Sequence, residues 1–81
     1  RRAYDDWVDS GAEIADLAAA QRAAEASHNA QVKEYRLGLV TNLDVLMALQ
    51  TLLDAKRALD DARIESRRRY VALMVAAEVL P

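Results

Sequence analysis

The chain has 81 residues, of which 53% are hydrophobic and 30% charged, and its formal net charge is −2. That length makes at most one small domain, whose core would be marginal on its own. The near-neutral charge argues against a nucleic-acid or anionic membrane partner, because both favour a basic surface. The lack of cysteine excludes disulfides and thiolate metal sites, and no stretch approaches the roughly 20 apolar residues of a membrane helix.

The first segment, from about residue 3 to residue 37, has the residue spacing of a helix. Steps of three and four mark one helix face and exclude a strand. Ser10 and Glu13 fit a capping box around Gly11, which would let the helix restart there. Because a glycine within a helix costs only about 1 kcal/mol, we expect one continuous helix. Its larger apolar residues are Trp7, Ile14, Leu17, Ala24, Val32 and Tyr35, and beside them runs an alanine line of Ala12, Ala15, Ala19, Ala23, Ala26 and Ala30.

The second segment, from about residue 43 to residue 80, carries a heptad pattern. Its apolar steps alternate three and four without a slip, which is typical of a coiled coil. Alanine alternates with larger residues, so the two backbones can approach closely. The first two turns are apolar nearly all round, which indicates neighbours on several sides. The predicted seam consists of Val45, Ala48, Leu52, Ala55, Leu59 and Ala62, and continues through Ser66, Arg69, Leu73, Ala76 and Leu80.

Charged residues fill the outer face of the second segment. Three pairs have the spacing of helix ion pairs: Asp54 with Arg57, Lys56 with Asp60, and Glu65 with Arg69. The basic run at 67–69 is interpreted as a solvated face, because acids lie within two turns of it. Since Arg69 falls on the seam, we expect the seam to be open to water there or paired with an acid.

The stretch YRLGLVTNLDVL, residues 35–46, interrupts the helical pattern. Gly38 suits the residue just after a helix C-terminus, and Leu39 would fold back to make the apolar contact of such a cap. Thr41 is the predicted N-cap, with Asn42 as the alternative, and Asp44 would complete a capping box. A turn this short, at about 38–42, forces two antiparallel helices of about 50 Å each. We therefore predict an all-α, two-helix coiled-coil hairpin that assembles into a helical bundle.

No residue pattern predicts catalysis or a cofactor. His28 is the only histidine and lacks the further ligands that a metal site needs. A hairpin offers the acids at 5–9 and 60–61 no buried pocket of the kind that general acid catalysis needs, so they are interpreted as solvated charge. Trp7 and Tyr4 are interpreted as helix-packing residues, and we expect Trp7 to contact Tyr70.

The stretch at 35–46 resembles the outer membrane efflux protein (TolC-like) family. That family has Tyr-x-x-Gly, a small hydroxyl residue and Leu-Asp-Val-Leu, followed by recurring leucine and alanine. The resemblance extends over nearly the whole chain and is greater to the second, C-terminal repeat than to the first. Two positions differ: Met47 stands where some members have a second acid, and Glu78 where glycine is usual.

The resemblance implies that this chain is one periplasmic hairpin of a trimeric channel in the outer membrane of a Gram-negative bacterium. Such channels serve tripartite efflux pumps and type I secretion systems. Residues Gly38, Leu39, Val40, Thr41 and Asn42 would form the tip that docks onto the periplasmic adaptor protein, and Asp44 would lie just inside the entrance aperture. The β-strands of that family are missing from this sequence, so we expect the chain to be part of a longer protein.

Two other functions remain open. The chain could be the coiled-coil hairpin of the adaptor protein itself, although Leu-Asp-Val-Leu favours the channel. It could also be a generic dimerising helical domain. In either case we expect apolar flanks to make the isolated chain self-associate, most simply into an antiparallel four-helix dimer.

Overall fold

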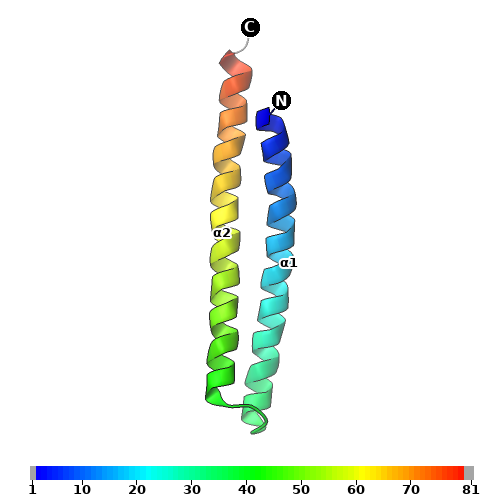
Figure 1. The fold of residues 1–81 in the computed structure, drawn as a ribbon, viewed down its shortest axis with the longest axis vertical. Coiled ribbons are helices and arrows are strands. Elements are labelled where there is room, and N and C mark those ends of the chain that lie inside the picture. Colours follow the sequence, from blue (N-terminus) through cyan, green and yellow to red (C-terminus); the bar gives the residue numbers. More distant parts are fainter. Residues whose placement is uncertain (1, 80–81) are drawn as a thin grey trace.

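The computed structural model describes residues 2–79, which form two long helices joined by a short turn (Figure 1). Helix α1 spans Arg2–Arg36 and helix α2 spans Asn42–Val79. The helices lie side by side and antiparallel, and the molecule measures 67 × 14 × 12 Å. The predicted all-α hairpin is confirmed. The observed helix bounds differ from the predicted ones by one residue, and positions 80 and 81 lie outside the described residues.

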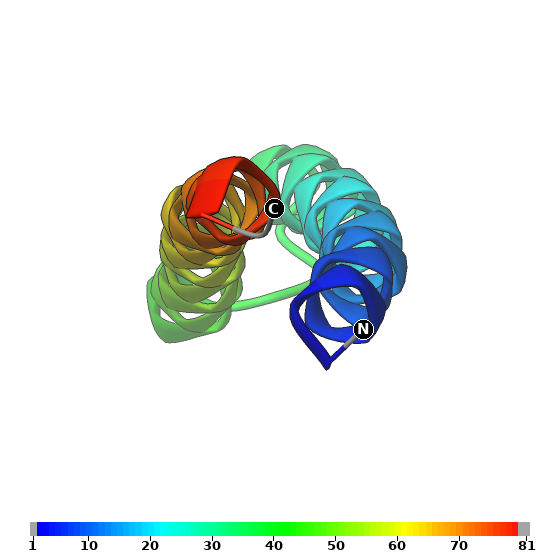
Figure 2. The same cartoon turned by 90° about the horizontal axis from the view of Figure 1, so that it is seen from above.

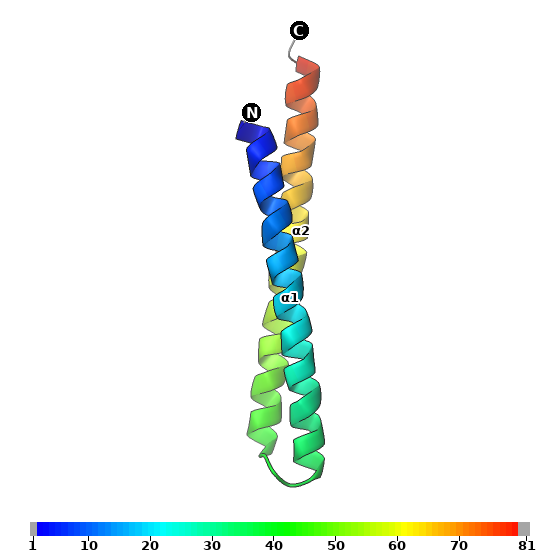
Figure 3. The ribbon, with the colours of Figure 1, turned by 90° about the vertical axis from the view of Figure 1, so that its right-hand side faces the viewer.

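The two helices wind around one another along their length (Figures 2 and 3). A heptad repeat has 3.5 residues per turn, slightly fewer than a straight α-helix, so two helices must coil to keep one seam in contact. The observed winding therefore follows from the repeat of the second helix.

The predicted seam of α2 faces α1 over most of its length. Leu52 and Leu59 are the buried apolar residues of the described chain, with 6% and 3% exposure. Ala76 is exposed, which corrects the prediction, because the pairing of the helices places it beyond the start of α1; Leu80 lies outside the described residues. The other seam residues are half-buried: Val45, Ala48, Ala55, Ala62, Ser66, Arg69 and Leu73.

The seam of α1 contains polar residues that the apolar pattern did not reveal. Ile14, Leu17 and Ala24 are half-buried as expected of a seam, but so are three polar residues at the same spacing: Gln21, His28 and Gln31. Within the described chain Gln31 Oε1 is buried without a hydrogen-bond partner. The alanine line lies on the face away from α2, because all six of its members are exposed: Ala12, Ala15, Ala19, Ala23, Ala26 and Ala30.

Two serine side chains, one from each helix, meet near the open end of the hairpin. The hydroxyl oxygens of Ser10 and Ser66 lie 3.2 Å apart, and Ser10 is only 2% exposed. Ser10 Oγ also donates to the carbonyl of Trp7 within the same helix, at 2.7 Å. Helix α1 is thus continuous through Gly11, as expected, and does not restart there. The rings of Trp7 and Tyr70 lie 5.7 Å apart, which confirms the predicted contact.

One of the three predicted ion pairs is present. Glu65 contacts Arg69 at 3.7 Å and Arg68 at 3.8 Å. Arg69 is thus a half-buried seam residue paired with an acid, as expected. The predicted pairs of Asp54 with Arg57 and of Lys56 with Asp60 are not among the ion pairs of residues 2–79. Asp54 instead accepts a hydrogen bond from Gln50 Nε2 at 2.9 Å, and exposed pairs gain too little to fix long side chains.

Candidate docking tip

Helix α1 ends in a Schellman cap. The amide of Leu39 donates to the carbonyl of Glu34 at 2.9 Å, and the amide of Gly38 donates to the carbonyl of Tyr35 at 3.0 Å. These are the two hydrogen bonds that define the motif. Gly38 has φ of 77°, a left-handed conformation that L side chains rarely adopt. The predicted role of this glycine is confirmed.

Helix α2 begins with a capping box. Thr41 Oγ1 accepts a hydrogen bond from the amide of Asp44 at 3.3 Å, and Asp44 Oδ2 accepts one from the amide of Thr41 at 2.9 Å. The Thr41 hydroxyl lies 3.0 Å from the same carboxylate oxygen. Thr41 is therefore the N-cap, and Asn42 is the first helical residue. Reciprocal bonds of this kind satisfy backbone groups that a helix start leaves unpaired.

The leucine side chains of the turn are mostly exposed, although its backbone groups are hydrogen-bonded. Leu37 is 74% exposed and Leu39 is 72% exposed. The expected fold-back of Leu39 onto the end of α1 is therefore wrong. The residue that it would cover is Glu34, which has a charged head and offers a poor apolar partner. Val40 is half-buried and is the turn's own packing residue.

Exposed apolar residues continue from the turn onto the first turns of α2. Leu43 is 64% exposed and Met47 is 61% exposed, while Leu46 and Leu53 are about half exposed. Together with Leu37 and Leu39, the residues Leu43 and Met47 form what we call the apolar tip. Clusters of exposed apolar groups on a small protein mark interaction sites. The expectation that this end has neighbours on several sides stays a prediction.

The structure brings the predicted tip residues together at one end of the hairpin (Figure 1). Asp44 lies next to them, on the first turn of α2, and its carboxylate is engaged by Thr41. The predicted seam runs away from the tip as a separate contact between the helices. The role of Asp44 at an entrance aperture stays a prediction.

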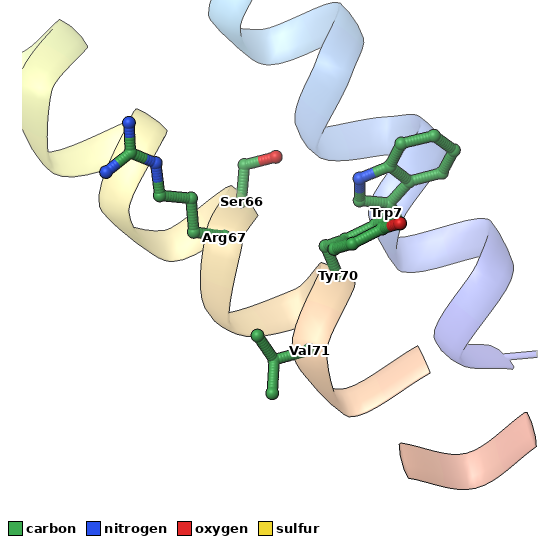
Figure 4. A pocket seen from close by; sticks show the side chains of 5 residues that line it. All are labelled: Trp7, Ser66, Arg67, Tyr70 and Val71. Carbon is green, nitrogen blue, oxygen red and sulfur yellow. The ribbon is translucent and has the colours of Figure 1, made fainter. Parts of the chain in front are cut away.

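A concave surface lies at the open end of the hairpin and was not predicted from the sequence. It is lined by Trp7 of α1 and by Ser66, Arg67, Tyr70 and Val71 of α2 (Figure 4). It continues along α2 past Ile64 and Arg68. The spacing of Ile64, Arg67 and Val71, in steps of three and four, is the sequence signal that could have revealed a second face on this helix.

Among residues 2–79, no three histidine, aspartate or glutamate side chains gather where they could hold a metal ion. Neither described helix has a stretch that is long and apolar enough to cross a membrane.

Comparisons of the chain with models of protein families, with curated proteins and with solved structures found no match.

Proposed function

We propose that this chain is a periplasmic hairpin of a TolC-like outer-membrane channel and that its turn docks onto the coiled-coil hairpin of a periplasmic adaptor protein. The proposal rests on the resemblance at residues 35–46 together with the geometry of the turn. It gives the chain a structural and docking role, without catalysis or a cofactor. Its partners would be the adaptor and the other hairpins of the same channel.

The observation that supports this proposal most is the separation of roles within the turn. Its backbone groups are hydrogen-bonded through the Schellman cap and the capping box, so the loop has a defined shape. Its leucine side chains at positions 37 and 39 nevertheless remain about three-quarters exposed. A shaped loop that presents apolar side chains suits recognition by a preformed partner, because little ordering remains to be done on binding.

The residues of the turn divide accordingly. Gly38 and Thr41 fix the backbone, and Leu39 supplies the apolar contact. Val40 is half-buried and contributes to both roles. Asp44 is exposed, but its carboxylate accepts the capping-box hydrogen bond from the amide of Thr41. A role of Asp44 at a channel entrance would therefore be additional to this structural role.

A second candidate function is a self-associating helical domain that needs no adaptor. The observation in its favour is the apolar surface away from the tip. Val8, Ile64, Val71 and Val75 are each about half exposed at the open end. Such a domain would use these flanks, whereas the docking proposal uses the tip.

The test compares two leucine substitutions for binding to the coiled-coil hairpins of purified periplasmic adaptor proteins. We expect Leu39→Asp to weaken binding at least about tenfold, because it places a charge in the apolar contact. The matched control is Leu53→Asp, which changes an exposed leucine of α2 away from the turn and should leave binding nearly unchanged. Equal binding by wild type and Leu39→Asp, with both chains helical by circular dichroism, would exclude the tip as the docking site.

A further inference from the structure

The concave surface at the open end of the hairpin has an aromatic side and a basic side. The rings of Trp7 and Tyr70 lie 5.7 Å apart, with their planes at 48° to one another. Figure 4 shows the guanidinium of Arg67 on the side of the hollow away from these two rings. We call this surface the open-end groove, and its lining residues are Trp7, Ser66, Arg67, Tyr70 and Val71.

The open-end groove has the size of a small-molecule site. Its volume is about 410 Å³, which falls within the roughly 300–1,000 Å³ that is usual for such sites. Trp7 is 36% exposed and Tyr70 is 46% exposed. The two rings therefore contact each other and still present aromatic surface to a ligand, and such surface favours the stacking of a planar ring.

The lining of the groove is positively charged, although the chain as a whole has a formal charge of −2. Arg63, Arg67 and Arg68 line the groove and the hollows that continue it along α2, where Asp60 is the one lining acid. Both ion pairs of residues 2–79 are made by Glu65, and neither involves Arg63 or Arg67. The groove thus offers guanidinium groups that no acid of the described chain engages, and guanidinium is a strong donor to carboxylates.

The acids at the start of α1 lie on the other flank of the hairpin. Asp6 directly precedes the seam residue Trp7, whereas Tyr70 directly follows the seam residue Arg69. In an antiparallel helix pair, the positions that follow the seam on each helix share one flank, and those that precede it share the other. The groove therefore lies on the flank without these acids. The α1 residues that follow the seam at this height are uncharged: Tyr4, Val8, Gly11 and Ala15.

We propose that the open-end groove binds a small organic anion with a planar apolar body, of the class of aromatic carboxylates. The ring of the ligand lies against Trp7 and Tyr70, and its carboxylate accepts hydrogen bonds from the guanidinium of Arg67, whose fork of donors matches a carboxylate. A cation would be repelled by the arginines, and a neutral aromatic molecule would gain only the stacking. This site does not involve the tip and holds independently of the proposed docking function.

The experiment titrates the 81-residue chain with three ligands of similar shape and different charge. Indoleacetate carries a carboxylate, indoleacetamide is its neutral isostere, and tryptamine carries an ammonium group. Trp7 is the only tryptophan, so in an isotope-labelled chain its indole N–H gives a single nuclear magnetic resonance signal that reports on the groove. A low micromolar chain concentration keeps contacts between copies to a minimum.

The three ligands should bind in the order of their charge. We expect indoleacetate to shift the Trp7 signal with a dissociation constant of about 1 mM, the value typical of a ligand of this size. Indoleacetamide should bind about fivefold more weakly, because it lacks the charge-assisted hydrogen bonds, and tryptamine should bind most weakly.

Two substitutions separate the charge from the rings. Arg67→Gln should weaken indoleacetate about fivefold and leave indoleacetamide nearly unchanged, whereas Tyr70→Ala should weaken both ligands about fivefold. The matched control is Arg57→Gln, which removes another exposed arginine of α2 that does not line the groove and should leave both affinities unchanged. Circular dichroism checks each variant, and if Tyr70→Ala lowers the helicity, Arg67→Gln at its exposed position still decides.

Several results would overturn this assignment. Equal affinity for indoleacetate and indoleacetamide, or for indoleacetate and tryptamine, would mean that the arginines do not select an anion, and so would unchanged indoleacetate binding by Arg67→Gln. A Trp7 signal that stays in place while the signals of Leu37 and Leu39 move would place the ligand at the tip. A Trp7 signal that moves with chain concentration but not with ligand would mean that a second copy fills the groove.

Discussion

The turn and the seam of this hairpin are ordered by different means. At the turn, backbone hydrogen bonds fix the chain, through the Schellman cap at Gly38 and the capping box of Thr41 with Asp44. Along the seam the backbone is ordinary helix, and side chains such as Leu52 and Leu59 make the contact. The comparison shows that the turn is held in shape without burying its leucine side chains, whereas the seam is held together by burying its leucines.

Truncation of a buried leucine in the seam should have the largest effect on the free energy of unfolding. We expect Leu59→Ala to lower the free energy of unfolding by about 2–5 kcal/mol, the usual cost of a cavity at a buried leucine. Leu53→Ala, at an exposed position of the same helix, should change it by less than about 0.5 kcal/mol. Urea unfolding followed by circular dichroism gives both values, and similar losses at the two positions would mean that the seam does not hold the hairpin.

Replacing each of the two glycines by alanine should change the free energy of unfolding in opposite directions. An added Cβ meets nothing within 4 Å at either glycine, so the backbone alone decides. Gly38→Ala should cost about 1–2 kcal/mol because of its left-handed conformation. Gly11→Ala, within helix α1, should stabilise the chain by about 0.5–1 kcal/mol. If both variants shifted the midpoint temperature of thermal unfolding in the same direction, that result would contradict the assigned turn.

Loss of the N-cap should have a smaller effect than loss of a seam leucine. Thr41→Ala removes the hydroxyl that accepts the amide hydrogen of Asp44, and we expect a loss of about 1 kcal/mol. Asn42→Ala alters the neighbouring residue, which is inside the helix, and should cost clearly less. A greater loss at Asn42 than at Thr41, measured by the same unfolding experiment, would move the cap to Asn42.

The smallest effect is expected at the tip leucine. Leu39→Ser should change the free energy of unfolding by no more than about 0.5 kcal/mol, because its side chain is mostly exposed. Val40→Ser should cost more, since Val40 is half-buried in the same turn. If Leu39→Ser lowered the free energy of unfolding by more than about 1 kcal/mol, the leucine side chain would be stabilising the turn itself.

The sequence predicted the parts of the fold that local chemistry controls. A glycine after a helix, followed by Thr41 and Asp44 at capping-box spacing, determined the turn, and the heptads of α2 determined which residues meet α1. The ring contact of Trp7 with Tyr70 followed from the antiparallel register. These features depend on neighbours in the chain or on a strict period.

Other features depend on which face of a helix turns inward, and the sequence left that open for α1. Its apolar residues and its alanine line are both periodic, and only the pairing with α2 shows that the seam takes Gln21, His28 and Gln31 while the alanines stay outside. Leu39 was expected to fold back onto the end of α1, but the residue that it would cover there is Glu34, which is charged. The concave surface at the open end was not predicted, because its arginines at 67 and 68 were interpreted as part of a solvated run.

The most direct test of the account follows the leucine methyl groups by nuclear magnetic resonance while a periplasmic adaptor hairpin is added. The account predicts that the methyl resonances of Leu37, Leu39 and Leu43 shift or broaden, while those of Leu52 and Leu59 in the seam stay where they are. Changes confined to the seam leucines, or an adaptor that leaves all five unchanged at saturating concentration, would contradict it.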